Sequence, residues 1–429
     1  MAPRVGAAFT AMVTREVLPN GLTLVTEAMP HVRSVAIGVW LRRGSRHETL
    51  PQAGISHFIE HMVFKGTRNR SAEDIASEVD SIGGHMDAFT AKEYASFHLK
   101  VLDEHLPLAV DILGDIVMNP LFDAVEMAKE KRVIFEEMGM VEDTPDDLVM
   151  ELFAGAFWPG HPLGRPILGT RKSVDRFERA HLLSFFRRVY HPGNVVVAAA
   201  GHLKHEAVSA CVGKSFGALA AGAAPKNGSA PRPAHGIVTR TKKELEQVHV
   251  CLGTPAFPQG HEDRYGCYVL NTILGGSMSS RLFQNVRERR GLVYSISSGV
   301  TAYSDAGNLT IYAGTSLENV DEVLKLTLEE LRRLKLERVP EIELRRAKDH
   351  LKGSLMLSLE NTGSRMSHLA RQEIYHGRQF GLDETLRGIE RVAADDVQRI
   401  SSDLFQGDLT LSILGNLGRY RPKPSQVRV

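Results

Sequence analysis

The run Gly54-Ile55-Ser56-His57-Phe58-Ile59-Glu60-His61-Met62-Val63-Phe64 carries most of the chemical information in this chain. As a helix, it places His57 and His61 one turn apart on the same face, where both imidazoles can reach one ion. Glu60 lies three residues after His57 and next to His61, so its carboxylate reaches the same patch. The apolar residues of the run would form the buried wall of the helix: Ile55, Phe58, Ile59, Met62 and Val63.

Two imidazoles and a nearby carboxylate are the parts of a hydrolytic zinc site. A catalytic zinc keeps one coordination position for water and lowers the pKa of that water to about 7. A carboxylate within reach can take the water's proton and pass it to the leaving amine. The spacing H-x-x-E-H is one of the zinc-peptidase motifs. A chance coincidence of these residues on one helix is the competing interpretation, because short motifs give false matches.

A third ligand is expected on a second helix, and the stretch Asp123–Gly139 has helical composition. Glu130 and Glu137 are seven residues apart and share one face, whereas Glu136 points about 100° away. Such a face can give one carboxylate to the metal and use the other to support a ligand. Spacing does not choose between them, and a plain solvated acidic face is the alternative.

Beyond the motif, several other stretches of the chain match the sequence pattern of a known peptidase family, in the same order and at the same spacing. They are Asn20–Leu22, Gly54–Thr67, Gly83–Thr90, Phe122–Asp123, Glu130–Glu137 and Arg287–Ser295. On these residues the chain resembles the pitrilysin-type metallopeptidases with an inverted zinc motif. The similarity is greatest to the short-chain branch of mitochondrial processing peptidase and its bacterial relatives, and it spans about residues 14–417.

The resemblance implies roles for individual residues of the first half. His57, His61 and Glu137 would hold one Zn²⁺ per chain, with Glu60 as general base and Glu130 as a supporting acid. All five are present, which argues against the inactive relatives that tend to lose this set.

The resemblance also suggests how substrate is held. The segment Asp87-Ala88-Phe89 would be an unpaired strand edge that binds extended peptide through main-chain hydrogen bonds. Arg287 and Tyr294 of the second half would reach across a closed chamber to the substrate, where the tyrosine hydroxyl stabilises an oxyanion and the arginine clamps a carbonyl. An internal strand and a solvated arginine are the plain alternatives.

Length and composition predict two domains of an ordinary globular protein, since 429 residues are long for one core. Residues 217–236 turn to Ala, Gly, Pro, Ser and Asn, so we expect an N-terminal zinc-binding domain at 1–216, a linker at 217–236 and a C-terminal domain at 237–429. The order of predicted strands and helices recurs after the linker. We therefore expect two homologous α+β domains, each a mostly antiparallel sheet packed with helices, with no metal in the second.

These observations favour a zinc endopeptidase that cleaves peptides or unfolded segments. The family's chamber needs four such domains, so a homodimer, or a heterodimer with an inactive homologue, is expected. A net charge of +1 gives no reason to expect nucleic acid as a partner, and no segment is long and apolar enough to cross a membrane.

Two alternatives stay open. One is a processing peptidase for targeting sequences, whose acidic contacts would be Glu142, Asp143, Asp146 and Asp147. The other is a non-catalytic partner or scaffold subunit. The expected location is the bacterial cytoplasm, although the basic, acid-poor start of the chain also resembles a presequence for the mitochondrial matrix.

Overall fold

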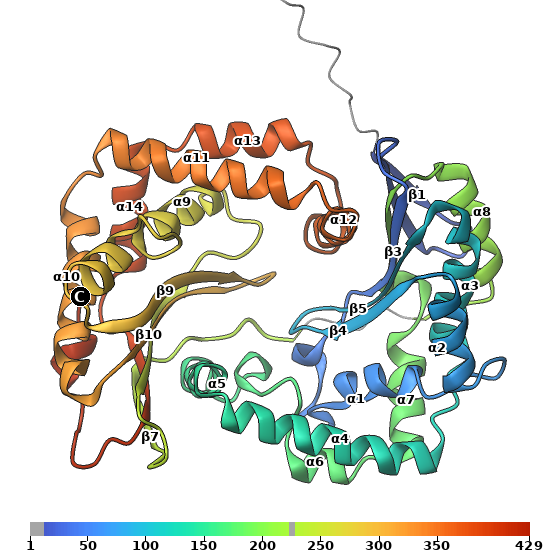
Figure 1. Ribbon diagram of the computed structural model, residues 1–429, viewed down its shortest axis with the longest axis horizontal. Coiled ribbons are helices and arrows are strands. Elements are labelled where there is room, and N and C mark those ends of the chain that lie inside the picture. The colour runs from blue at the N-terminus through green and yellow to red at the C-terminus, as the bar shows by residue number, and fades with distance from the viewer. Residues whose placement is uncertain (1–12, 223–227) are drawn as a thin grey trace, which may run out of the picture.

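The computed structural model describes residues 13–222 and 228–429, and in it two α+β halves lie side by side (Figure 1). Most of the basic N-terminal stretch and residues 223–227 of the predicted linker lie outside the described residues. Within the described ranges, no helix is long and apolar enough to span a membrane.

The first half is a six-stranded sheet in the order β1-β2-β6-β3-β5-β4, with helices packed on it. The strands are β1 Val13–Val17, β2 Thr23–Ala28, β3 Ser34–Leu41, β4 His85–Thr90, β5 Ala95–Leu102 and β6 Val195–Gly201. The helices are α1 Ile55–Val63, α2 Ala72–Ser81, α3 Leu106–Met118, α4 Ala124–Asp143, α5 Pro145–Phe157, α6 Arg171–Asp175, α7 Arg179–Val189 and α8 His205–Phe216.

The second half is a five-stranded sheet in the order β7-β11-β8-β10-β9. Its strands are β7 Gly236–Thr241, β8 Val248–Ala256, β9 Val293–Ala302, β10 Gly307–Thr315 and β11 Thr410–Gly415. Its helices are α9 Arg264–Leu274, α10 Val320–Leu336, α11 Glu341–Ser358, α12 Thr362–His376, α13 Leu382–Glu390 and α14 Ala394–Leu404, with a π-helical segment η6 at Phe283–Glu288.

The two sheets repeat one topology, which confirms the expected fold class. Matching β2-β6-β3-β5-β4 with β7-β11-β8-β10-β9 pairs every strand of the second sheet with one of the first. In each sheet one neighbouring pair is parallel, β2 with β6 and β7 with β11, and the remaining pairs are antiparallel. The bounds 1–216, 217–236 and 237–429 stay a prediction, with which the end of α8 and the start of β7 agree.

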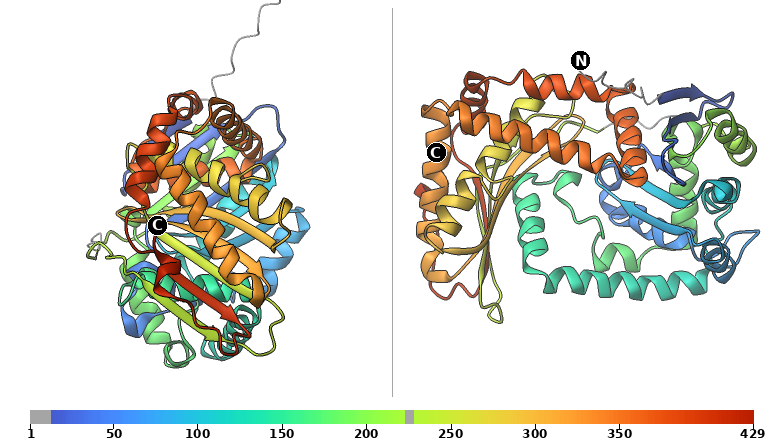
Figure 2. Two further views of the ribbon diagram at one scale, coloured as in Figure 1. Left: turned by 90° about the vertical axis from the view of Figure 1, so that its left-hand side faces the viewer. Right: turned by 45° about the horizontal axis from the view of Figure 1, so that its top comes forward.

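One helix of each half packs against the sheet of the other half (Figure 1, and Figure 2, right). Helix α12 of the second half packs on β2, β3 and β6, and helix α5 of the first half packs on β7, β8 and β11. The first contact forms a small core of its own around Trp40, Met366 and Leu369. The second forms another around Phe153, Phe157 and Cys251. The face of each sheet that is turned toward the other half is therefore buried by a helix from that half.

Glycines let the two exchanged helices come close to their sheets. A Cβ on Gly38 of β3 would lie 3.0 Å from the sulfur of Met366, and one on Gly253 of β8 would lie 2.4 Å from the ring of Phe153. Both glycines stand in the matching strands β3 and β8. Any larger side chain there would push the crossing helix away.

Buried ion pairs add to these apolar contacts. The Glu373 side chain on α12 is 1% exposed and lies 2.9 Å from Arg15 and 3.2 Å from Arg42. A third pair joins Arg365 to Glu27 at 3.4 Å. Removing one partner of such pairs leaves an uncompensated charge, so they favour this one position of α12.

We predict that Leu369→Ala destabilises the whole chain by about 2–5 kcal/mol, because it opens a cavity between α12 and the foreign sheet. Chemical denaturation measures this loss. The control is Ile342→Ala on α11, whose side chain is exposed. Equal stability of the two variants would contradict the packing described here.

Candidate metal centre

The helix that carries the motif is anchored at its first turn by a buried carboxylate. Gly54 precedes α1 with φ +93°, and a Cβ there would lie 2.5 Å from the carbonyl oxygen of Leu168. Because glycine has no side chain to cap the helix, Glu48 does so from outside: its two oxygens accept hydrogen bonds from the N–H groups of Gly54 and Ser56, both at 2.8 Å. A carboxylate here also complements the positive end of the helix dipole.

Burial raises the pKa of Glu48 to about 7, although the hydrogen bonds from the N–H groups of Gly54 and Ser56 act in the opposite direction. The side chain comes from a segment before α1 whose local sequence has no capping pattern, so sequence analysis missed it. A carboxylate that stays buried despite this cost indicates that the start of α1 needs it.

Three predicted ligands converge on one point. The rings of His57 and His61 lie 4.6 Å apart, centre to centre. The Nε2 atom of His57 is 3.7 Å from one oxygen of Glu137, and Nε2 of His61 is 3.5 Å from the other. Among the described residues these three form the one group of histidines, cysteines and acids with ligand atoms within 4.8 Å of one another.

The spacing of these atoms fits a zinc ion. The nitrogen–oxygen separations exceed hydrogen-bond length, but a cation about 2.0–2.1 Å from each ligand fits between them. The Glu137 oxygen nearest His57 is buried and accepts no hydrogen bond from the described residues. Burial, together with the field of His61, lowers the pKa of His57 to about 4, so its imidazole is neutral at pH 7, as a ligand must be.

Glu130 supports a ligand from behind. One of its oxygens lies 3.0 Å from Nδ1 of His61, and the other is 2.8 Å from the ammonium of Lys65. Burial opposes ionisation of Glu130, but the hydrogen bonds from Lys65 and His61 outweigh it and lower the pKa of this carboxyl. An ionised acceptor on Nδ1 leaves Nε2 of His61 free to face Glu137. Sequence analysis had given Lys65 no role.

Glu60 faces the same space but contacts another element. The hydroxyl of Thr90, the last residue of β4, donates a hydrogen bond to its carboxylate. Burial raises the pKa of Glu60, the Thr90 hydrogen bond and His61 oppose this, and the fields of Glu137 and Asp87 add to it. A carboxylate that lies beside the metal ligands and has a raised pKa is suited to accept a proton during catalysis.

A pocket of about 440 Å³, which we call the metal pocket, lies between β4 and the helices that carry the metal ligands. Its lining includes Glu60, His61, Phe64, Ala88 and Asp87. Strand β4 is the edge of its sheet, so one side of it has no strand partner among the described residues. This edge position matches the expected peptide-binding strand.

Side chains of β4 alternate between two faces. Thr90 and Ala88 face α1, whereas Phe89 packs edge-to-face on Trp40 at 5.5 Å and lines a second pocket on the α12 side. Asp87 is exposed and lines both pockets. Phe89 therefore does not share the metal pocket.

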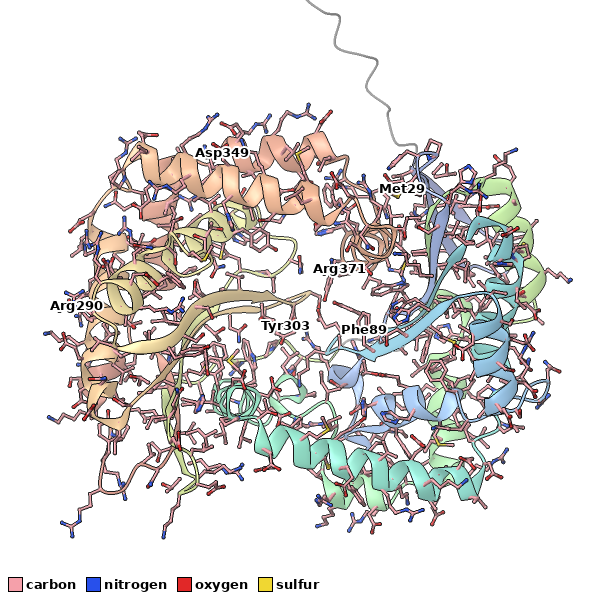
Figure 3. All side chains as sticks on the ribbon, viewed as in Figure 1. Met29, Phe89, Arg290, Tyr303, Asp349 and Arg371 are labelled. Carbon is pink, nitrogen blue, oxygen red and sulfur yellow. The ribbon has the colours of Figure 1, made fainter. Side chains whose placement is uncertain are left out.

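Arg287 and Tyr294 lie in the second half and do not line the metal pocket. Arg287 stacks on Phe283 at 4.6 Å, in the π-helical segment, and Tyr294 on β9 is 78% exposed. Figure 3 shows Arg290 at the outer edge of the second half and Phe89 near the centre of the molecule. Within this chain the structure does not bring the pair to the metal cluster.

Comparison with known proteins finds two models of one peptidase family along the chain. Residues 23–171 match the model described as insulinase (peptidase family M16), and residues 176–351 match the peptidase M16 inactive domain. The second match begins in the first half, just before α7, and ends within α11.

Similar proteins share nearly the whole length. The chain is 43% identical over 407 residues to YmxG, an uncharacterized zinc protease of Bacillus subtilis, covering 95% of this chain and 99% of that one. It is 40% identical over 418 residues to an uncharacterized zinc protease of Mycobacterium tuberculosis, Rv2782c, covering 96% and 95%.

Solved structures share the fold at low sequence identity. A protease from Helicobacter pylori has a TM-score of 0.89 at 20% identity, covering 95% of this chain and all of that one. A peptidase M16 inactive domain from Pseudomonas fluorescens has a TM-score of 0.89 at 21% identity, covering 96% and 100%.

We predict that Glu48→Ala weakens zinc binding about 10-fold and lowers the free energy of unfolding by about 1–3 kcal/mol, because the first turn of α1 loses its cap. Zinc titration and chemical denaturation measure the two effects. Glu73→Ala, an exposed acid on α2, is the control and should change neither.

The same carboxylate gives a pH dependence. Its pKa is about 7 in the fold against an ordinary 4.5, so the folded state holds the extra proton between these values. Stability contributed by Glu48 therefore falls as pH rises from 4.5 to 7, and wild type should lose stability relative to Glu48→Gln across that window. A constant difference would refute the assigned role.

Proposed function

Because this chain belongs to the pitrilysin-type M16 family of metallopeptidases, we propose that it is a zinc-dependent endopeptidase of peptides and unfolded protein segments. The convergence of His57, His61 and Glu137, with Glu60 at the same pocket, is the observation that carries this proposal. The names of the bacterial relatives support zinc and proteolysis, and their organisms support the expected bacterial cytoplasmic location.

The proposed chemistry divides between the metal and the chain. One zinc per chain, held by His57, His61 and Glu137, would acidify a bound water and polarise the scissile carbonyl. Glu60 would take the proton from the attacking water and give it to the leaving amine. Thr90 holds the Glu60 carboxylate toward the pocket, and Glu130 fixes the ring of His61.

Substrate would lie along β4 as an added strand. The free edge at Asp87, Ala88 and Phe89 offers main-chain groups to any extended peptide, whatever its side chains. A folded protein cannot supply such a strand, which is why peptides and unfolded segments are the proposed substrates.

The non-catalytic alternative is less well supported. A relic subunit has no need to keep three ligands, a base and a supporting acid. Here His57, His61 and Glu137 converge, Glu130 contacts His61, and Glu60 lines the same pocket.

The targeting-sequence alternative stays open. Glu142 forms an ion pair with Arg240 at 2.6 Å. The side chain of Asp143, however, is 85% exposed, and Asp146 and Asp147 are exposed as well.

We propose that Arg287 and Tyr294 serve the active site of a partner chain. Neither lines the metal pocket of its own chain, and Tyr294 is exposed on β9. Two such chains facing each other would supply the four α+β domains of a closed chamber. A homodimer then has two complete sites, each built from both chains.

We predict that Glu60→Gln retains one zinc per chain and loses turnover about 10²–10⁴-fold, because the amide cannot accept the proton. Cleavage of quenched fluorescent peptides and zinc content of the purified chain measure the two effects. Full turnover in this variant would refute the general-base assignment.

Two neighbouring acids on α4 give a matched control for the metal. Glu137→Gln should lose zinc, whereas Glu136→Gln should keep it, because Glu136 is exposed and outside the ligand cluster. Zinc lost equally from both variants would show damage to α4 rather than a missing ligand.

Mixed dimers test the shared site. Glu60→Gln chains and Tyr294→Phe chains, each weak alone, should recover roughly half of the wild-type turnover when co-purified through two different tags, since one of the two sites is then intact. If the mixed dimers stay as weak as their parents, Tyr294 acts within its own chain or not at all.

A further inference from the structure

A cavity of about 410 Å³ lies in the second half between α9, α11, α12 and α13. Two arginines, Arg264 and Arg371, line it together with aromatic rings and apolar side chains, among them Tyr265, Tyr268 and Phe380. We call this cavity the arginine–aromatic pocket. The proposed function does not use it.

The positive charge of the pocket is not neutralised by an acidic side chain among the described residues that line it. No aspartate or glutamate is among the described residues that line it, and neither arginine forms an ion pair with a carboxylate within the described part of the chain. Arg264 donates to the carbonyl of His261 and to the hydroxyl of Tyr265, both at 3.2 Å, and Arg371 donates to the carbonyl of Ser367 at 3.3 Å. Each guanidinium has five N–H donors, so donors remain for a ligand.

The charge of the pocket comes from the arginines rather than from its histidines. Burial, with the field of Arg371, lowers the pKa of His368 to about 4, and burial also lowers the pKa of His376. Both imidazoles are therefore neutral at pH 7. Both arginines line the cavity together with Tyr268; burial raises the pKa of Tyr268, and the field of each arginine opposes that rise.

Arg264 is held in place by aromatic rings. Its guanidinium lies 4.4 Å from the ring of Tyr265 and 5.4 Å from that of Phe380. Stacking fixes the plane of the guanidinium and leaves its edge for an anion. A planar guanidinium edge matches a carboxylate, which it can bind through two parallel hydrogen bonds.

Shared lining residues relate this pocket, through one intermediate cavity, to the pocket at the metal ligands. The metal pocket and the neighbouring cavity of about 530 Å³ share Asp87. That cavity in turn shares Leu355, His368 and Arg371 with the arginine–aromatic pocket. Figure 3 shows Arg371 and Phe89 at the same central space between the halves. A peptide lying on β4 can therefore extend into the pocket.

We propose that the arginine–aromatic pocket binds a carboxylate of the peptide substrate while another part of the same peptide lies on β4 at the metal. The carboxylate is either the C-terminus of the peptide or an acidic side chain some residues from the cleaved bond. This inference rests on the proposed function for the identity of the ligand as a peptide. Carboxylate binding in this pocket would make the chain prefer anionic peptides, although the metal pocket itself does not select for charge.

Binding rather than cleavage gives the first test, so that it stands apart from the proposed catalysis. Short fluorescein-labelled peptides are titrated into the full-length Glu60→Gln chain and followed by fluorescence anisotropy. One pair differs only in a C-terminal carboxylate against a C-terminal amide, and a second pair, both amidated, differs in one Glu against Gln. We expect one pair to show about 10-fold tighter binding of the anionic member, as for a charged hydrogen bond. The pair that responds identifies the source of the carboxylate.

Substitutions then locate the effect. Arg371→Gln should abolish the preference while leaving binding of the neutral peptide unchanged, and Arg371→Lys should keep part of it. Arg378→Gln is the matched control: Arg378 stacks on Phe380 at 3.8 Å but pairs with Glu384 at 3.0 Å and does not line the pocket. It should keep the full preference.

Three results would overturn the proposal: equal binding of anionic and neutral peptides in both pairs, a preference that survives Arg371→Gln, or a preference lost equally in Arg378→Gln. The comparison of peptides needs no pocket variant, so it stands even if Arg371→Gln does not fold. If wild type cleaves nothing but the preference is present, the proposed function fails and the pocket remains.

Discussion

The contact between the short helix α1 and the long helix α4 is the interaction on which the rest of this structure depends. Helix α1 supplies His57, Glu60 and His61, and α4 supplies Glu130 and Glu137. A nine-residue helix is too short to be stable on its own, so its position comes from its neighbours. Glu48 holds its start, the buried face of α1 packs into the core, and α4 closes the side where the ligands meet.

The exchange of α5 and α12 extends this dependence to the whole chain. The sheet that carries β4 is covered, on the face turned toward the second half, by a helix from that half, and the reverse holds for the other sheet. Neither half has a complete set of buried surfaces without its partner. In this arrangement the cavity beside Phe89 shares lining residues with both the metal pocket and the arginine–aromatic pocket.

Much of this could be predicted from the sequence, because local signals determined it. The spacing in the motif predicted α1 and its two histidines, and the recurring order of elements predicted two similar α+β units. The exchanged helices could not be predicted, since an amphipathic segment does not reveal which sheet it covers. The capping role of Glu48 could not be predicted either, because its partners are main-chain N–H groups, which a pattern of side chains does not reveal. Spacing alone left Glu130 and Glu137 equivalent, and the structure distinguishes them, one oxygen of Glu137 facing each Nε2 and Glu130 facing Nδ1.

The central claim is that two imidazoles from α1 and a carboxylate from α4 hold one zinc ion. Diffraction from crystals of protein purified without chelator, recorded on both sides of the zinc absorption edge, tests it most directly. The account predicts one anomalous peak per chain, about 2.0–2.1 Å from His57, His61 and Glu137. Zinc bound elsewhere, or no peak while these three side chains stand apart, would contradict it.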